Sequence, residues 1–245
     1  TVLHWLSRTA FIQSARLLVT GITRTMLRKD IDTEKLIQNA FGSLTLLADS
    51  RNFLQYPHLW PAQIDSMLSE PGLISYTLDV IASEDWHVVS SALRLVGNII
   101  TGTEEQTERV IMREGFARLI EQCLDSSVAR VRREAAWILS NIAAGPPHHV
   151  QLILSVWMGS PQLLWLLHND DTRMQKKVCW VFTNVLSSLN TTPRPAQMTE
   201  FLGYGVLAIV EVASRLSDDT ELVSKIREVK VLSAVVHPEF WGVVE

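Results

Sequence analysis

Apolar residues recur at helical spacing along the chain, in short segments that turn residues separate. Between 101 and 145, three such segments follow one another: 107–115, 116–125 and 126–145. Positions three and four residues apart share one face of a helix, so each segment predicts a helix with one buried face. The sequence offers no convincing alternation of strands joined by hairpin turns. The chain is therefore expected to be all-α.

Turn residues set the expected ends of these helices. Gly115 can end the first helix, and the run Asp125-Ser126-Ser127 is a start signal for the third. Gly145, followed by two prolines, is a stop signal for that third helix. One short helix and two longer ones are thus predicted within about 43 residues.

The third helix of this unit recurs at a fixed period. Three segments align without gaps: ALRLVGNI from Ala92, AAWILSNI from Ala135 and VCWVFTNV from Val178. Their asparagines stand 43 residues apart, at Asn98, Asn141 and Asn184. A glycine stands 25 or 26 residues before each asparagine, at Gly72, Gly115 and Gly159. Two independent markers at one period indicate structural repeats.

A repeat of this length and helix content is typical of the armadillo and HEAT class of solenoids. We predict a single right-handed α-solenoid of this class over 1–245, with about five repeats. The repeats within 92–189 match one another best, and those in 1–91 and 190–245 diverge.

Each third helix has an apolar side and a mixed side. The apolar side is expected to face the core, and its residues are Ala92, Leu95, Val96 and Ile99, then Ala135, Ile138, Leu139 and Ile142, then Val178, Val181, Phe182 and Val185. The mixed side carries Ser91, Arg94 and Asn98, then Glu134, Trp137 and Asn141, then Lys177, Trp180 and Asn184. In a solenoid whose third helices line the inner surface, the mixed sides form one ladder of asparagines and one of Arg94, Trp137 and Trp180.

These ladders have the chemistry that holds an extended peptide. A primary amide both donates and accepts hydrogen bonds, so each asparagine can bind a peptide backbone of any sequence. Adjacent tryptophan faces can receive the aliphatic stems and cationic ends of Lys or Arg. Glu104, Glu105 and Glu134 are placed to add carboxylates. A single Trp on a helix usually belongs to the core, but recurrence of both Trp and Asn at equivalent positions favours a groove.

Composition narrows the partners. A net charge of -4 and a pI near 6.0 provide no global field that would attract nucleic acid or an anionic membrane. Cys123 and Cys179, both in apolar helical context, give little support to a disulfide framework or a thiolate metal site, so a reducing compartment is expected. We expect no cofactor and no metal, because His148 and His149 lack the spacing and partner ligands of a zinc site.

One uncharged segment, Val150–Leu167, just reaches the length of a membrane span. Gly159, Ser160 and Pro161 interrupt its centre, and no cluster of Lys or Arg flanks it closely. We therefore predict two short buried helices joined by a turn, and no membrane association.

The start of the chain, without Met or a leader, is typical of an excised fragment.

Two segments resemble the late armadillo repeats of importin-α, the adaptor family that recognises nuclear localisation signals. They are ALRLVGNIITGTEEQT from Ala92 and RREAAWILSNIAAG from Arg132, and the resemblance covers about 92–185. It implies that the right-handed α-solenoid consists of armadillo repeats. It also implies an adaptor that binds a Lys/Arg-rich signal in a concave groove for nuclear import, in the cytoplasm and nucleus. It also implies importin-β as a partner, through a segment outside this chain.

Arg94 matches one late repeat of that family in which Arg replaces Trp, which aligns this chain with the family's minor, C-terminal signal site. The peptide-binding residues that this alignment implies are Arg94, Asn98, Glu104, Thr107, Glu134, Trp137, Ser140, Asn141, Trp180 and Asn184.

The chain also departs from the family. Lys177 stands where the family carries a glutamate before its last tryptophan, and its charge opposes a basic ligand. The early repeats lack the ladder: His4 and Arg8, then Gly42 and Leu46, replace Trp and Asn. An insertion is expected within 51–61, because Leu46 and Asn98 are 52 residues apart.

Three classes of function follow. The first is an adaptor for basic nuclear localisation signals; the second is a diverged armadillo scaffold that no longer binds them. An enzyme is disfavoured: GYGVLA from Gly203 resembles a dinucleotide-binding loop, but no strand precedes it, so we interpret it as a turn.

RVRR from Arg130 is interpreted as a solvated helix start, not a nucleic-acid site. The segment from Asp218 is expected to be an amphipathic helix that caps the array.

Overall fold

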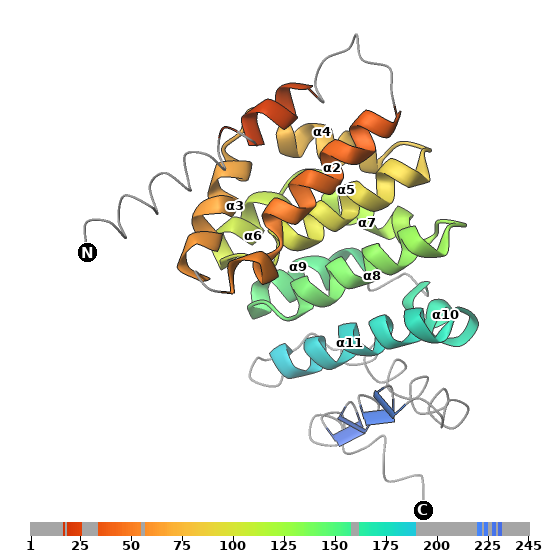
Figure 1. Ribbon diagram of the computed structural model, residues 1–245. Helices are drawn as coiled ribbons and strands as arrows, with labels where there is room; N and C mark the ends of the chain where they lie inside the picture. Colours follow the sequence, from red (N-terminus) through yellow and green to blue (C-terminus); the bar gives the residue numbers. More distant parts are fainter. Residues whose placement is uncertain are drawn as a thin grey trace, which may run out of the picture. The chain divides into compact units, whose positions relative to one another are not determined.

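The described part of the chain is helical throughout, apart from turns (Figure 1). The computed structural model describes residues 17, 19–25, 34–54, 57–157, 162–189, 220–221, 223–224, 227–228 and 230–231. The chain divides into two compact units, Thr1–Leu119 and Ile120–Glu245, with the division inside α7 (Phe116–Leu124). We call them unit 1 and unit 2.

Unit 1 contains two successive third helices, α2 and α5. Its elements are α2 (Glu34–Ala48), η1 (Ser50–Phe53), η2 (Pro57–Leu59), α3 (Trp60–Leu68), α4 (Leu73–Ile81), α5 (Trp86–Ile99) and α6 (Glu104–Ile111). Helix α5 packs against α2 and α4 (Figure 1), and Phe41, Leu44, Leu93 and Leu95 lie in the core with no exposed surface. The short helices η1 (50–53) and η2 (57–59) lie in or beside the segment 51–61, where the sequence predicted an insertion. The indole N–H of Trp60 donates to the carbonyl of Ala48 (2.8 Å) and ties this insertion to α2.

Unit 2 repeats the arrangement with α8 (Ala129–Ala143) and α11 (Thr172–Leu189) as its third helices. Between them lie α9 (Pro147–Trp157) and α10 (Gln162–Asn169). Helices α8 and α11 run side by side (Figure 1). Their apolar sides are buried as predicted: the side chains that close the core include Ala135, Ile138, Leu139, Val178 and Phe182.

The glycine markers of the repeat have a backbone reason. Gly72 and Gly115 each have φ of +78°, in the turn before α4 and before α7. A side chain is rarely tolerated in this left-handed conformation, so the position requires glycine. The third marker, Gly159, lies outside the described residues.

The predicted start of the third helix in unit 2 was wrong. Helix α8 begins at Ala129, and Val128 precedes it without a side-chain cap. Ser126 acts one turn earlier, where its hydroxyl accepts a hydrogen bond from the Val128 N–H (3.2 Å). The serines therefore shape the loop before the helix, and α8 itself ends at Ala143, close to the predicted stop.

The uncharged segment 150–167 does not form one helix. Helix α9 ends at Trp157 and α10 begins at Gln162, as two short helices would. Among the described residues, no helix combines the length and apolarity that a bilayer crossing requires. The connection at 158–161 lies outside the described residues.

Both cysteines are free and buried in unit 2. Burial raises the pKa of the Cys123 and Cys179 thiols to about 12, so they stay protonated at neutral pH. They therefore act as small apolar core residues.

Several predictions concern parts that the structure leaves undescribed. The early positions His4 and Arg8, the GYGVLA turn and most of the helix from Asp218 lie outside the described residues, although 220–221 are helical.

Gly42 provides a test of its placement inside α2. It lies inside α2, and a Cβ atom added there would meet no atom within 4 Å. Glycine inside a helix costs about 0.5–1 kcal/mol relative to alanine. We expect Gly42→Ala to raise the free energy of unfolding by this amount in urea denaturation. A matched substitution at Gly102, where an added Cβ would lie 2.4 Å from the Gln106 Oε1 atom, should lower it.

Candidate functional site

In unit 2, the mixed sides of α8 and α11 form two matching rows of side chains. The α8 stripe consists of Arg130, Arg133, Trp137 and Asn141, and the α11 stripe of Arg173, Lys176, Trp180 and Asn184. Within each stripe the spacing of three, four and four residues keeps the side chains on one helix face. Each member of one stripe stands 43 residues from its counterpart in the other.

A hydrogen bond fixes how the two stripes align. The side-chain amide of Asn184 donates to the backbone carbonyl of Ser140 (2.8 Å), the residue before Asn141. The two asparagines of unit 2 are therefore neighbours across the helix pair, and the 43-residue spacing places Trp180 opposite Trp137. Trp137, Asn141, Trp180 and Asn184 are all half-buried.

The same bond recurs in unit 1. The amide of Asn98 donates to the carbonyl of Thr45 (2.9 Å), the residue before Leu46 in α2. This confirms that Leu46 occupies the position that asparagine holds in later repeats. The sequence predicted that the asparagine amides bind a peptide. The structure shows that one N–H of Asn98 and one of Asn184 join neighbouring third helices. The Oδ1 atom and the second N–H of each amide are not needed for that bond.

In α2, the ladder positions are occupied by Gly42 and Leu46, which lack the amide and aromatic groups of the later repeats, as the sequence predicted. Leu46 is 65% exposed, and Gly42 presents no side chain. Neither residue can supply an amide or an aromatic face. Unit 1 therefore has one ladder rung in the described residues, formed by Arg94 and Asn98 of α5.

Three of the predicted binding residues have buried side chains. Glu134, Ser140 and Thr107 are 6%, 8% and 6% exposed. The Thr107 hydroxyl donates to the carbonyl of Ile100 (2.9 Å), so it closes the turn between α5 and α6. As contact residues for a ligand, these three remain predictions, and their burial limits what they can reach.

Arg94 and Glu104 lie exposed in unit 1. The hydrogen bond from the Arg51 side chain holds the pKa of Asp49 below its ordinary value, and the charge of Arg94 acts in the same direction. A carboxylate thus lies close enough to Arg94 to feel its charge, at the end of α2.

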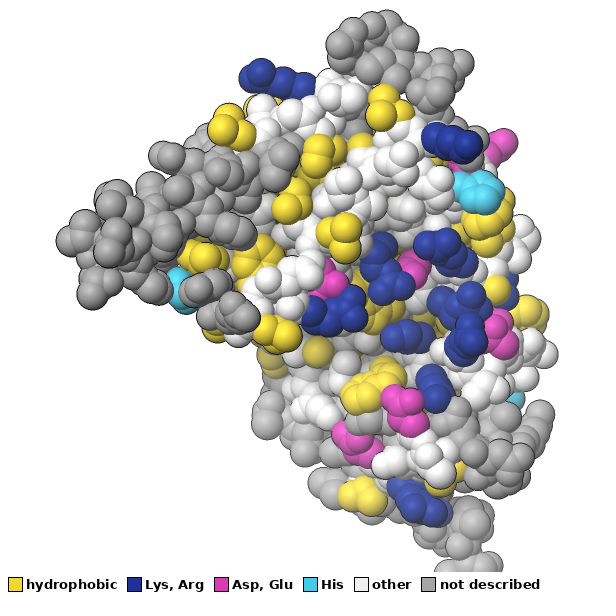
Figure 2. Space-filling view, viewed as in Figure 1, with side chains coloured by type: hydrophobic (Ala, Val, Ile, Leu, Met, Phe, Trp, Pro, Cys, Tyr) yellow, Lys and Arg dark blue, Asp and Glu magenta, His cyan; other side chains and the backbone are white. Residues whose placement is uncertain are grey.

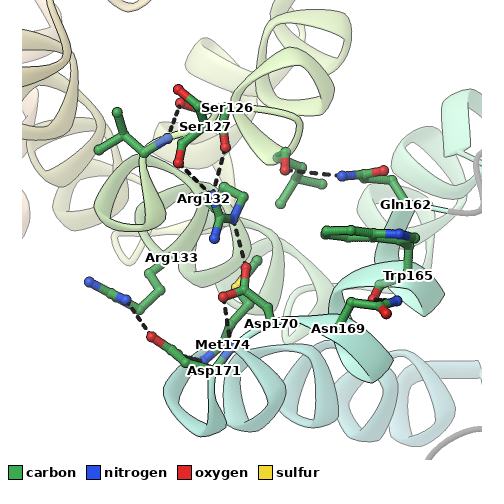
Figure 3. Close-up of polar contacts among 12 residues, drawn as sticks. Ser126, Ser127, Arg132, Arg133, Gln162, Trp165, Asn169, Asp170, Asp171 and Met174 are labelled. Carbon is green, nitrogen blue, oxygen red and sulfur yellow. Dashed lines mark hydrogen bonds and ion pairs between the residues drawn. The ribbon is translucent and has the colours of Figure 1, made fainter.

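The interpretation of RVRR as a solvated helix start was wrong for Arg132. Its side chain is only 16% exposed, and its Nε atom lies 2.6 Å from the Asp170 carboxylate (Figure 3). Its guanidinium also donates to the carbonyls of Ser126 (2.8 Å) and Ser127 (3.0 Å). Arg132 therefore joins the start of α8 to the turn before α11.

Two stripe residues also form ion pairs. Arg133 contacts Asp171 (2.9 Å; Figure 3), and Lys176 contacts Glu221 (3.1 Å). Asp171 has a second function, because its carboxylate accepts the Met174 N–H and caps α11. Sequence reasoning missed the basic half of both stripes, although the signal was present: Arg130 and Arg173, like Arg133 and Lys176, are 43 residues apart.

The net charge of these two helices is positive. Together α8 and α11 carry six Lys or Arg residues and one carboxylate, that of the buried Glu134. Figure 2 shows basic side chains over α8 on the face of the third helices, with acidic side chains beside several of them. Because the whole chain has a net charge of -4, this surface is a local exception.

Comparison with known proteins finds similarity between this chain and importin subunits of the alpha class. It is 26% identical over 128 residues to importin subunit alpha-1a of Oryza sativa subsp. japonica, a match that covers 52% of this chain and 22% of that protein. It is 32% identical over 108 residues to importin subunit alpha-9 of Arabidopsis thaliana, which covers 42% and 21%. The matched part thus spans about a fifth of these relatives' length. No family model matches the chain.

Solved structures agree on the fold. A designed armadillo repeat protein in complex with the peptide (KR)4 superposes with a TM-score of 0.66 at 17% identity, over 91% of this chain and 92% of the other. A computationally designed armadillo repeat protein for modular peptide recognition gives a TM-score of 0.67 with the same identity and coverage. The predicted armadillo fold is therefore confirmed, and the sequence relatives are importin-α subunits.

Proposed function

We propose that this armadillo-repeat protein, which is similar to importin-α subunits, is an adaptor that binds an extended peptide along the α8 and α11 stripes. The observation that carries the proposal is the bond from Asn184 to the Ser140 carbonyl, because it sets two Trp–Asn pairs in register on neighbouring helices. A repeated pair of an aromatic face and an amide matches the repeat of an extended peptide backbone.

The groups in the stripes are suited to that ligand. The amides of Asn141 and Asn184 can accept from and donate to backbone groups of a peptide. Trp137 and Trp180 are half-buried, so each keeps part of a ring surface available to ligand side chains. The buried apolar sides of α8 and α11 hold both rows rigidly, which lowers the entropic cost of binding.

A Lys/Arg-rich nuclear localisation signal is the ligand that the sequence predicted. The names of the importin-α relatives support it, as does the basic peptide bound by the designed armadillo protein. Trp137 and Trp180 could contribute cation–π contacts of about 0.5–2 kcal/mol each. A function in nuclear import, residence in the cytoplasm and nucleus, and an importin-β partner belong to this version of the proposal.

The second candidate is a scaffold whose ligand is not a basic signal. One observation favours it: Lys177 and the basic stripe residues precede the Trp–Asn pairs on the same two helices, and Glu134 is 6% exposed. Like charges across an interface cost affinity and reduce the association rate. Both candidates share the peptide-binding adaptor; they differ in the charge of its ligand.

The test is a titration of fluorescein-labelled 12-residue peptides, one Lys-rich and one Glu-rich, followed by fluorescence anisotropy. We expect one of them to bind, and Trp137→Ala to weaken that binding about tenfold, because an aromatic contact at the centre of an interface carries a large share of the energy. The matched control is Trp165→Ala, which removes a 53% exposed ring on α10, outside both stripes.

Two results would reject the adaptor. One is the absence of binding by both peptides at concentrations up to 1 mM, roughly the weakest affinity of interest. The other is an equal loss of affinity for the variants of Trp137 and Trp165, since binding would then not involve the stripes.

A further inference from the structure

The basic residues of the two stripes are placed where a bound peptide would meet them. Arg130 and Arg133 precede Trp137 by two turns and one turn of α8, on the face that Trp137 and Asn141 share. In α11, Arg173 and Lys176 hold the same positions relative to Trp180. A peptide that crosses the Trp–Asn pairs therefore passes beside two rows of cationic side chains.

Two carboxylates close to the stripes are buried. Asp170 is 5% exposed and bound to Arg132, and Glu134 is 6% exposed. Arg130 and Arg173, in contrast, are exposed, and they stand at equivalent positions of neighbouring helices. Two stripe cations already contact exposed carboxylates, Arg133 with Asp171 and Lys176 with Glu221. The positive charge that the stripes offer to a ligand therefore rests on Arg130 and Arg173.

We infer that the ligand of the α8 and α11 stripes is an acidic extended peptide, whose Asp or Glu side chains meet Arg130 and Arg173 while its backbone meets Asn141 and Asn184. This inference rests on the proposed function, since it names the ligand class of the same surface. Arginine is suited to the task because its planar guanidinium binds a carboxylate through two parallel hydrogen bonds.

The charge distribution favours a peptide over a nucleic acid. A chain with a net charge of -4 repels a long polyanion beyond the range of the patch, and the Debye length is about 10 Å at 0.1 M salt. A short peptide with a few carboxylates can lie on the stripes alone. The asparagines also offer a backbone contact that a nucleic acid cannot use in the same way.

The experiment compares three 12-residue peptides of one design, with Glu, Lys or Ser at alternate positions, by anisotropy titration of the full chain in 50 mM and 300 mM salt. We expect the Glu peptide to bind about tenfold more tightly than the Ser peptide at low salt and to lose most of that advantage at high salt. The Lys peptide should bind more weakly than the Ser peptide.

Charge reversal then locates the site. The double variant Arg130→Glu/Arg173→Glu should lower affinity for the Glu peptide about tenfold or more and raise it for the Lys peptide. Both residues are exposed, so the fold should persist, as circular dichroism can verify. The matched control, Arg24→Glu/Arg118→Glu, makes the same charge change at two exposed residues of unit 1 and should alter affinity less than twofold.

The outcomes separate the two proposals. If the Lys peptide binds most tightly and loses affinity on Trp137→Ala, the acidic ligand is excluded and the adaptor stands. An equal effect of both double variants, or tighter binding of a 12-nucleotide single strand than of the Glu peptide, also excludes the acidic-peptide site. If none of the three peptides binds, the adaptor itself is rejected.

Discussion

Replacing Asp170 with asparagine is expected to lower the free energy of unfolding by about 3 kcal/mol. Breaking a largely buried ion pair leaves its partner charge without compensation, which typically costs 3–5 kcal/mol. Asp170 and Arg132 have side-chain exposures of 5% and 16%, and the distance between their Oδ2 and Nε atoms is 2.6 Å. Urea denaturation, followed by circular dichroism, measures the change.

The neighbouring pair supplies the control. Asp171→Asn removes the charge that Arg133 contacts, but Arg133 and Asp171 are 27% and 49% exposed, so water compensates. Asparagine also retains an acceptor for the helix cap. We expect a loss below about 1 kcal/mol. Equal losses for the two variants would contradict the assignment of Arg132 and Asp170 as the structural pair.

The pH dependence provides a second measurement on Asp170. Burial opposes its ionisation, but the hydrogen bond and charge of Arg132, with the Asp171 N–H, hold its pKa below the ordinary value. A carboxyl with a lower pKa in the folded state stabilises the fold above its unfolded pKa, about 3.9, and loses this contribution as the pH falls through the folded pKa. The native protein should therefore lose stability below about pH 4 more steeply than Asp170→Asn.

The sequence predicted the repeat and its helices well because both depend on local pattern. Helical spacing of apolar residues gave the buried side of α5, α8 and α11, and the Gly72 and Gly115 markers coincide with backbone turns that need positive φ. These features are set by residues close together in the chain. Period and helix content were therefore sufficient for the armadillo and HEAT class of solenoids, and the resemblance to importin-α then favoured armadillo repeats.

The candidate site was predictable only in part because its contacts join residues 38 to 53 positions apart. The pattern identified Asn98 and Asn184 but gave no sign that each amide joins neighbouring helices. It also assigned Arg132 to solvent, since a basic run at a helix start usually is solvated. The partner that buries it, Asp170, belongs to the next repeat. Contacts between repeats determine the structural roles of Asn98, Asn184 and Arg132. The sequence of a single repeat does not reveal these contacts.

In unit 1, the side chain of Gln106 joins α6 to α3, as the Arg132–Asp170 pair joins two repeats of unit 2. Replacing Gln106 with glutamate should lower the free energy of unfolding by about 2–3 kcal/mol. The side chain is 3% exposed. Its Oε1 atom accepts from the Thr103 N–H (3.0 Å), and its Nε2 atom donates to the Pro61 carbonyl and to the Asp65 carboxylate, both at 2.8 Å. Glutamate keeps the capping acceptor but loses both donations and places a second carboxylate against Asp65. Unsatisfied buried groups of this kind cost about 1–3 kcal/mol, more when they are charged.

The helix dipole alone predicts that Gln106→Glu raises the free energy of unfolding, so the sign of the measured change distinguishes the two effects. A negative charge in the first turn of α6 should favour the helix by about 0.3–1 kcal/mol through its dipole. The matched control is Gln151→Glu, the same change at an exposed position of α9, which should alter stability by less than about 0.5 kcal/mol. If Gln106→Glu is neutral or stabilising in urea denaturation, Gln106 is only a helix cap. A loss that diminishes as the pH is lowered toward 4 instead identifies repulsion from Asp65, and with it the bond that joins α6 to α3.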